Sequence, residues 1–189
     1  MSDLAATLRG RLVVLEPVDP RHEGGLWEAA TEDRSIWRWM KADYSASRER
    51  FHAYLFHPDP GGVTFATLDA ADGRALGSTR FLAVREDDRV LEIGSTWLRR
   101  SAWGTGANVE AKLLMLAHAF DAWGAQRVEL KTDARNERSR GAMEAFGARF
   151  EGIARKHMRC EYGVRDSAWY AVTDDEWPDV RRTLERRLR

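Results

Sequence analysis

The stretch Trp97–Asn108, with the sequence WLRRSAWGTGAN, decides the fold because it joins an alternating, strand-like segment directly to a long amphipathic one. Gly104 and Gly106 allow the backbone to turn tightly and to approach a ligand closely. The amides around Thr105–Asn108 then point away from the start of the predicted helix, where the positive end of the helix dipole favours phosphate. The pattern predicts a pyrophosphate site, although a Gly-x-Gly before a helix is equally compatible with a plain turn.

Two common nucleotide-binding motifs are absent from this stretch. It lacks the Gly-Lys-Ser/Thr of a P-loop. It also lacks the third glycine of a dinucleotide fingerprint, and no acidic residue stands where a ribose partner is expected. The pattern therefore gives little support to ATP or NAD as the ligand.

The segments around this stretch alternate between strand and helix patterns. This order predicts an α+β (mixed α/β) fold, with an antiparallel meander where the connections are short. The predicted strands are Arg11–Val18, Val63–Leu68, Ala75–Val84, Val90–Leu98, Arg127–Thr132, Ala148–Arg159 and Ser167–Val172. The predicted helices are Glu23–Thr31, Ser47–Phe56, Ala107–Trp123, Asn136–Phe146 and a short terminal helix opened by Pro178.

Length and charge narrow the function classes. The 189 residues suit one domain, residues 1–189. Thirty basic residues balance thirty acidic ones, which argues against a nucleic-acid partner. The single Cys160 forms no internal disulfide, and no pair of histidines has metal-ligand spacing, so we expect no metal. Without an apolar signal core or a run of roughly 20 apolar residues, the expectation is a cytoplasmic protein with no membrane partner.

The order of elements resembles the GNAT superfamily of N-acetyltransferases, and within it the branch of ribosomal-protein-alanine acetyltransferases. The resemblance extends from Arg11 to about Trp177. It is carried by WRWM at Trp37–Met40, EIGSTWL at Glu92–Leu98, WGTGANVEAK at Trp103–Lys112, KTDARNERSRGAMEAFGA at Lys131–Ala148, and RDSAWYAV at Arg165–Val172 with Glu176 and Trp177.

The resemblance implies a bent, mostly antiparallel sheet flanked by helices, in which the strands ending near Leu98 and Asp133 splay apart. The pantetheine arm of acetyl-coenzyme A (acetyl-CoA), the expected co-substrate, lies in that opening. Gly94 suits a bulge there, and Asn136 either contacts the pantetheine or caps the following helix. The implied cofactor-binding residues are Trp97, Leu98, Arg99, Trp103, Gly104, Thr105, Gly106, Ala107, Asn108 and Asn136.

The chain departs from the family pattern at two positions. Ser101 occupies a position where the family often has Gln or Arg, so Arg99 or Arg100 is the alternative phosphate contact. Met143 stands where many members carry a tyrosine that protonates the departing thiolate, and a methionine has no proton to donate. The general acid is therefore left unassigned by the resemblance.

The expected chemistry requires a base, because a lysine-like amine with a pKa of about 10.4 is mostly protonated at neutral pH. Glu92 is the first candidate, with Glu16 and Asp133 as weaker ones; Glu92 is otherwise an exposed strand glutamate that balances Arg89 or Arg99. A backbone amide near Trp97 or Leu98 is expected to stabilise the developing oxyanion. Ser139 either donates a hydrogen bond near sulfur or supports the helix cap.

The predicted acceptor site lies between the early helices and the sheet, where Trp37, Trp39 and Tyr44, together with Trp97, form an aromatic wall with acids nearby that suits an amine. Trp37 and Trp39 are alternatively core residues. The predicted function is transfer of acetyl from acetyl-CoA to a primary amine, of a protein N-terminus or a small molecule. Alternatives are an acyl-CoA-binding module without efficient turnover, transfer of another acyl group such as succinyl, and a structural or nucleic-acid partner. A homodimer through the late strands is also expected.

Overall fold

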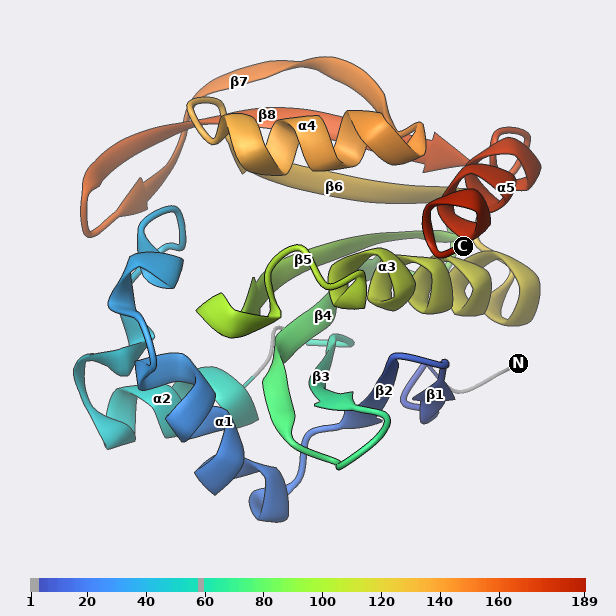
Figure 1. The fold of residues 1–189 in the computed structure, drawn as a ribbon. Helices are drawn as coiled ribbons and strands as arrows, with labels where there is room; N and C mark the ends of the chain where they lie inside the picture. Colours follow the sequence, from blue (N-terminus) through green and yellow to red (C-terminus); the bar gives the residue numbers. More distant parts are fainter. Residues whose placement is uncertain (1–3, 58–59) are drawn as a thin grey trace.

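The computed structural model describes residues 4–57 and 60–189, and its centre is one eight-stranded sheet with the order β1-β2-β3-β4-β5-β6-β8-β7 (Figure 1). All neighbouring strands are antiparallel except β5 and β6, which are parallel. The strands are β1 (Leu8–Arg9), β2 (Val13–Pro17), β3 (Val63–Asp69), β4 (Ala75–Arg85), β5 (Val90–Leu98), β6 (Arg127–Asp133), β7 (Arg149–Cys160) and β8 (Gly163–Thr173).

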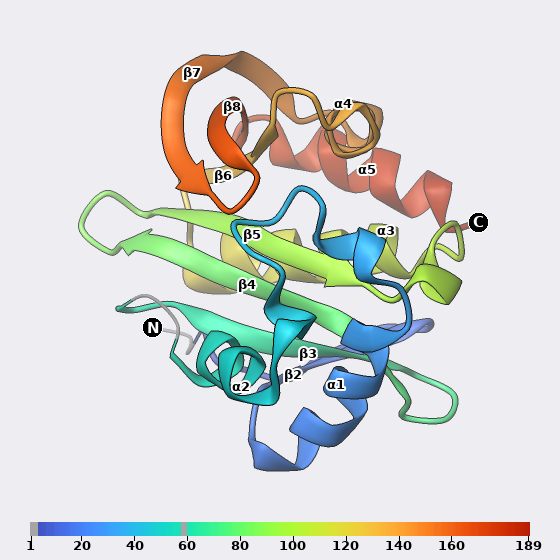
Figure 2. The same ribbon diagram turned by 90° about the vertical axis from the view of Figure 1, so that its left-hand side faces the viewer.

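The sheet divides where β5 meets β6. These strands pair only over Val90–Glu92 and Arg127–Glu129, and the rest of each strand has no partner across the gap. Figures 1 and 2 show the two strands diverging, with β6, β7 and β8 on one side and β1 to β5 on the other. The divergence confirms the splayed, mostly antiparallel sheet predicted from the sequence.

A bulge bends β5 on the edge of this opening. Ser78 pairs with Trp97 and Arg80 pairs with Gly94, so β5 carries one extra residue in this interval. Ser95, inside the interval, has a φ of +48°, in the left-handed region. An extra residue turns the strand and re-aims the side chains around it, which agrees with the bend expected near Gly94.

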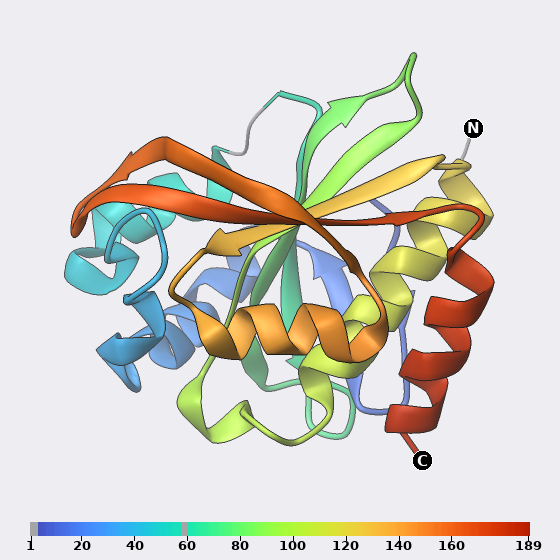
Figure 3. The same ribbon diagram turned by 90° about the horizontal axis from the view of Figure 1, so that it is seen from above.

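In the described part of the chain, five α-helices flank the sheet in two groups, and each group covers its own apolar core. Figure 3 shows α3, α4 and α5 as neighbours, with α1 and α2 on the left. The core beneath α3 and α5 includes Leu91, Met115 and Tyr170, and the core beneath α1 and α2 includes Leu26 and Phe51. The helices are α1 (Glu23–Thr31), α2 (Arg48–Phe56), α3 (Ala107–Ala117), α4 (Glu137–Phe146) and α5 (Trp177–Arg187).

Most element boundaries agree with the sequence patterns. Ser47 caps α2 through its side chain, and Pro178 lies in the first turn of α5. The helix predicted as Ala107–Trp123 is α-helical as far as Ala117 and continues as a π-helical segment, His118–Trp123. The two-residue strand β1 was not predicted, because its length is too short for any periodicity to show. Within residues 4–57 and 60–189, no helix has the length and apolar character needed to cross a membrane.

Candidate active site

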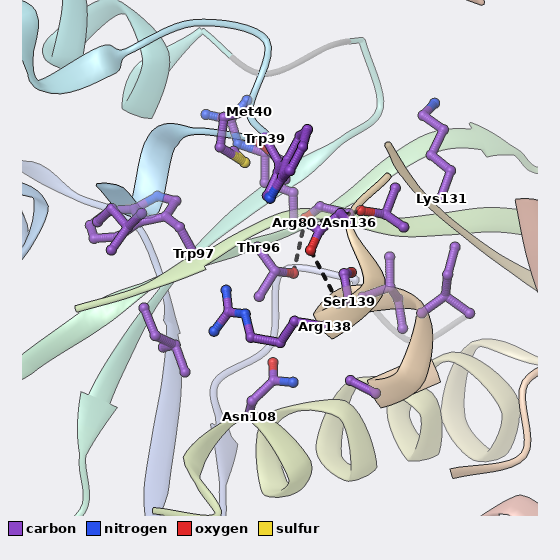
Figure 4. Close-up of a pocket in the computed structure, with 18 of the residues that line it drawn as sticks. Trp39, Met40, Arg80, Thr96, Trp97, Asn108, Lys131, Asn136, Arg138 and Ser139 are labelled. Carbon is purple, nitrogen blue, oxygen red and sulfur yellow. Dashed lines mark hydrogen bonds between the residues drawn. The ribbon is translucent and has the colours of Figure 1, made fainter. Parts of the chain in front are cut away.

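A cavity of about 1430 Å³ occupies the opening between β5 and β6 (Figure 4). Pockets for one small ligand usually measure about 300–1,000 Å³, so this cavity has room for more than one. It passes from one face of the sheet to the other. Ser95 faces α2, where its Oγ lies 3.0 Å from Tyr54 Oη, whereas Thr96 faces α3, where Lys112 Nζ donates to its Oγ1 at 2.8 Å.

We therefore divide the cavity into two halves along β5. In Figure 4, Asn108 and Arg138 lie on the side of α3, whereas Trp39 and Met40 lie at the opposite edge. The α3 half comprises Trp103, Gly104, Gly106, Asn108, Lys112, Asn136, Arg138, Ser139 and Met143, with Arg100 at its mouth. The α2 half comprises Trp39, Tyr44, Tyr54, Arg80, Glu92, Lys131 and Arg165.

The loop before α3 presents backbone to the cavity. Gly104 and Gly106 have φ values of +79° and +88°, which side-chain-bearing residues rarely adopt. Gly106 is the N-cap of α3 and has no side chain with which to cap the helix; Thr105 Oγ1 accepts a long hydrogen bond of 3.4 Å from the amide of Ala107. A Cβ at Gly104 would meet no protein atom within 4 Å, so the space beside it is free for a ligand. Such a helix start suits an anion.

Thr105 and Ala107 support this loop rather than line the cavity. Thr105 Oγ1 donates to the carbonyl of Ala102 at 2.8 Å, and Ala107 is buried against the core. The sequence prediction for both residues concerns their backbone amides, and it stays a prediction. Their side chains fix the conformation of the loop.

Two guanidinium groups meet at the indole ring of Trp103. Arg138 Cζ lies 3.4 Å and Arg100 Cζ 4.2 Å from the ring centroid. Partial burial lowers the pKa of Arg138, and the nearby charge of Arg100 adds to this effect. Among the described residues, neither arginine has a carboxylate within ion-pair distance. Two like charges held this close favour a polyvalent anion between them.

Arg99 does not join this pair, which corrects the sequence prediction for it. Its guanidinium forms an ion pair with Glu32, and the amide of Ser101 donates to the same carboxylate at 2.8 Å. The adjacent Arg100 is the one that lines the cavity. The sequence around two consecutive arginines does not show which side chain enters the cavity. Here the outcome depends on Glu32, which is far from Arg99 in the sequence.

Leu98 directs its peptide groups into the opening. Arg99 N donates to the carbonyl of Leu76 on β4 at 2.7 Å. Peptide groups alternate in direction along a strand, so those of Leu98 point away from β4. Its carbonyl accepts from Trp103 Nε1 at 2.9 Å. Leu98 and Trp97 both line the cavity, as predicted.

The start of α4 forms the far wall of the α3 half. Asn136 caps α4, since its Oδ1 accepts from the amide of Ser139 at 3.2 Å, and its Nδ2 donates to Thr132 Oγ1 at 3.1 Å. Asn136, Ser139 and Met143 all line the cavity. The capping role of Asn136 is confirmed, and its contact with pantetheine stays a prediction.

Lys112 is a cavity residue that the sequence reasoning missed. It donates to Thr96 Oγ1, which lies 2.7 Å from Thr79 Oγ1, and no carboxylate among the described residues pairs with it. Burial lowers the pKa of Lys112 to about 7. Its spacing in the sequence could have predicted its burial. Lys112 follows Val109 by three residues and precedes Leu116 by four, which places it within the apolar stripe of α3.

Glu92 lies in the α2 half and is only 2% exposed. Burial raises the pKa of its carboxyl, although Lys131 Nζ at 2.7 Å opposes that rise. A Cβ at Gly94 would lie 2.5 Å from Glu92 Oε1, so this glycine makes room for the carboxylate. The alternative interpretation of Glu92 as an exposed strand residue paired with Arg89 or Arg99 is wrong.

The two weaker base candidates have other partners. Glu16 does not line the cavity and pairs with Arg21 and His22. Asp133 is buried and bound by Arg135; despite the opposing effect of burial, hydrogen bonds lower its pKa to about 2. A carboxylate with so low a pKa is a poor proton acceptor at neutral pH.

The aromatic wall is present, with one correction. Trp39 and Tyr44 line the cavity, and Tyr44 stacks on Tyr54 with ring centroids 4.0 Å apart. Trp37, in contrast, is 3% exposed within the core beneath α1 and α2, and its Nε1 donates to the carbonyl of Ala30 at 3.0 Å. Trp37 is therefore a core residue that supports the wall from behind.

The charge of the cavity also differs from the expectation of acids beside the aromatic wall. Among the described residues that line it, ten are lysine or arginine and two are glutamate. In the α2 half, Arg80 and Arg165 are each 7% exposed. Neither was predicted, because they lie on β4 and β8, far apart in the sequence. The described residues contain no cluster of three or more His, Cys, Asp or Glu that could hold a metal ion.

Comparison with known proteins agrees with this geometry. The family model described as "Acetyltransferase (GNAT) domain" matches residues 12–149. The N-acetyltransferase Rv2669 of Mycobacterium tuberculosis (strain H37Rv), itself described as uncharacterized, is 33% identical over 110 residues. That match covers 58% of this chain and 66% of the relative, just under two thirds of its length.

Two solved structures share the fold over nearly the whole chain. A GCN5-related N-acetyltransferase from Brucella melitensis superposes with a TM-score of 0.90 at 31% identity, covering 98% of this chain and 86% of that one. RimJ from Mycobacterium smegmatis superposes with a TM-score of 0.82 at 21% identity, covering 97% and 94%. At that identity the likeness to RimJ concerns the fold alone. The family match, the splayed sheet and the glycine loop before α3 together establish that this chain belongs to the GNAT acetyltransferase domain family.

Proposed function

We propose that this protein is an N-acetyltransferase that moves an acetyl group from acetyl-CoA to a primary amine. The observation that carries the proposal is the α3 half, where a glycine loop, a helix start with glycine as its N-cap and two arginines without a carboxylate partner among the described residues converge. This arrangement suits a diphosphate. The RimJ structure that shares this fold holds a coenzyme A disulfide.

The remaining parts of acetyl-CoA fit along the opening. The unpaired edge of β5 offers the peptide groups of Leu98 to an amide-containing arm, as a neighbouring strand would. Asn136 and Ser139 face the same space from α4. The arm would bring the thioester to the bulge at Ser95, where the α3 half meets the α2 half.

Glu92 is the base in this proposal. An attacking amine must first lose a proton, and a carboxylate whose pKa is raised by burial accepts one better at neutral pH than an exposed carboxylate does. The amide of Leu98 is aimed into the opening and can donate to the thioester oxygen as negative charge develops there. Once the C–N bond forms and the C–S bond breaks, the thiolate takes a proton from Ser139 or from solvent, because Met143 has none to give.

Two measurements test the proposal. Acetyl-CoA should raise the melting temperature, and acetyl-CoA with a panel of amines and peptides should release free thiol. A melting shift without thiol release supports the alternative that Met143 suggests, a binding module without turnover. Faster thiol release from succinyl-CoA than from acetyl-CoA would mean that the transferred group is succinyl. If neither thioester raised the melting temperature, the cavity would not be an acyl-CoA site.

We also propose that two copies pair through the late strands. β7 is an edge strand, and Phe150 and Ile153 on β7 and Val164 on β8 are large apolar residues that remain exposed. Exposed apolar side chains on two neighbouring strands favour association. Sedimentation of the protein and of Ile153→Lys should give a dimer for the parent and a monomer for the variant.

A further inference from the structure

Arg80 is a buried cation without a counter-ion. Its side chain lies in the α2 half, and the residue is 7% exposed. Its Nη2 donates to the carbonyl of Tyr54, and its Cζ lies 4.1 Å from the centroid of the Tyr54 ring. Its Nε is enclosed and has no hydrogen-bond partner. No carboxylate among the described residues lies within ion-pair distance of it.

This arrangement is unfavourable for the protein on its own. A buried charge is costly unless it is paired and hydrogen-bonded. An arginine cannot relieve that cost by losing its proton, because the guanidinium group stays charged in proteins. The carbonyl and the ring of Tyr54 compensate only part of the charge, so an anion from outside would complete the site.

Nearby charges do not supply that anion. Glu92, the one carboxylate in this half of the cavity, is already paired with Lys131. Arg165 is also buried, and its Nε donates to the hydroxyl of Ser167. Glu92, Lys131, Arg80 and Arg165 together carry a formal charge of +2, the sum of three cations and one anion, in a protein whose net charge is zero.

The positions of Arg80 and Glu92 indicate how one small molecule would use both. Arg80 pairs with Gly94 across β4 and β5, and Glu92 lies two residues along β5 on the same face. Such diagonal neighbours are roughly 7–8 Å apart. An amine beside Glu92 and an anionic group beside Arg80 would therefore belong to one compact acceptor.

We infer that the acceptor is a small amine that also bears a carboxylate or phosphate group, and that Arg80 binds this anionic group, with Arg165 opposite. The guanidinium fork suits either oxyanion. The inference rests on the proposed function of the same cavity. It names the class of acceptor, which the acetyltransferase proposal by itself leaves open.

The test uses amines matched in carbon skeleton. Acetylation of β-alanine is compared with that of β-alaninamide, and acetylation of phosphoethanolamine with that of ethanolamine, as kcat/KM at fixed acetyl-CoA. A charge-assisted hydrogen bond of ordinary strength predicts a preference of about 10- to 100-fold for the anionic member of at least one pair. The pair that shows the preference distinguishes carboxylate from phosphate.

Variants then assign the preference to Arg80. Arg80→Gln should reduce the kcat/KM of the anionic amine to within about threefold of that of its uncharged counterpart. Arg80→Lys should retain part of the preference for the anionic amine. Arg85→Gln is the matched control, because Arg85 lies on the same strand outside the cavity and pairs with Glu129 and Asp88. It should keep the parental ratio.

The parent enzyme alone can overturn the inference, whether or not a variant folds. Equal or faster acetylation of the uncharged amines in both pairs contradicts it and leaves the proposed function standing. An anionic preference that survives in folded Arg80→Gln also contradicts it, because another group then binds the anion. Absence of a melting shift with acetyl-CoA would instead contradict the proposed function itself.

Discussion

The two halves of the cavity are built in different ways. In the α3 half, the ligand-facing groups come from two short segments, residues 100–112 and 136–143, and include the backbone of the glycine loop and the exposed cations Arg100 and Arg138. In the α2 half they are side chains from several separate elements, among them the buried Arg80 and Glu92. Backbone amides recognise a fixed chemical feature such as a diphosphate, whereas side chains can be exchanged to suit different acceptors. Under the proposed function, this difference assigns recognition of the co-substrate to the α3 half and selection of the acceptor to the α2 half.

The halves also differ in how their charges are solvated. Arg100 and Arg138 sit at the exposed mouth, where water and salt weaken their interactions. Arg80 and Glu92 lie behind the aromatic wall, where each charge interacts more strongly and costs more if unpaired. Substitutions should therefore affect binding of acetyl-CoA in one half and turnover of the acceptor in the other.

Gly104→Asp should disable the α3 half and give the largest effect. Gly104 has a φ of +79°, and an aspartate there would place a negative charge against the diphosphate. Repulsion between two charges about 4 Å apart near a protein surface is about 4 kcal/mol, or roughly a thousandfold in affinity. Calorimetry with acetyl-CoA measures this loss directly.

The matched control for that variant is Gly73→Asp. Gly73 has a similar φ of +75° in the turn before β4, and a Cβ there also meets no atom within 4 Å. The same backbone strain should then leave acetyl-CoA affinity at the parental value. Equal affinities for Gly104→Asp and the parent would exclude the glycine loop from the site.

Glu92→Gln should disable the α2 half while acetyl-CoA still binds. Removing a general base typically lowers turnover by about a hundredfold or more. The loss should shrink at high pH, where free amine is abundant. Because burial raises the pKa of Glu92, parental activity should fall as the pH drops through a value above the ordinary 4.5. Rate profiles against pH for both proteins measure these effects.

Glu129→Gln is the control for Glu92. Glu129 is the residue that pairs with Glu92 across β5 and β6, yet it does not line the cavity and binds Arg85 and Arg127. Its substitution should leave turnover close to that of the parent. Parallel pH profiles for Glu92→Gln and the parent would mean that another group takes the proton.

Lys112→Met should have the smallest effect of these substitutions, and the affected quantity is the stability of the fold. The pKa of Lys112 is lowered to about 7 from an ordinary 10.5, so between these values the unfolded chain holds a proton that the folded chain has released. Stability should therefore rise with pH in this window, by up to about 2 kcal/mol between pH 7 and pH 9.

Lys112→Met removes this contribution, so its stability should be flatter over the same pH interval. Denaturant unfolding at pH 7, 8 and 9 measures both slopes. Equal dependence of the unfolding free energy on pH in parent and variant would mean that the Lys112 ammonium group is hydrated, and would contradict its burial.

The same contrast explains how much could be predicted from the sequence. The five helices, seven of the strands and the glycine loop follow from local periodicity and turn residues, and so did the placement of Asn136 at a helix start. The α3 half comes from two short segments, residues 100–112 and 136–143, so most of its residues could be named together. Glu92 was reached through the resemblance to the GNAT superfamily.

The α2 half could not be assembled in the same way. Arg80 and Arg165 meet there only because β4 and β8 lie on opposite sides of the opening, which local patterns do not reveal. Trp37 and Trp39 are two residues apart, yet Trp37, the last residue of a 3-10 helix (Arg34–Trp37), is buried in the core, whereas Trp39 lies beyond that helix and lines the cavity. Whether a given side chain points into the core or into the cavity depends on tertiary packing.

The most direct test of the central claim is a crystal structure with acetyl-CoA bound. The account predicts the diphosphate against the amides that follow Gly104, between Arg100 and Arg138, with the pantetheine arm along Leu98 and the thioester at the bulge of β5. A diphosphate bound elsewhere, or an opening between β5 and β6 filled by the protein's own side chains, would contradict it.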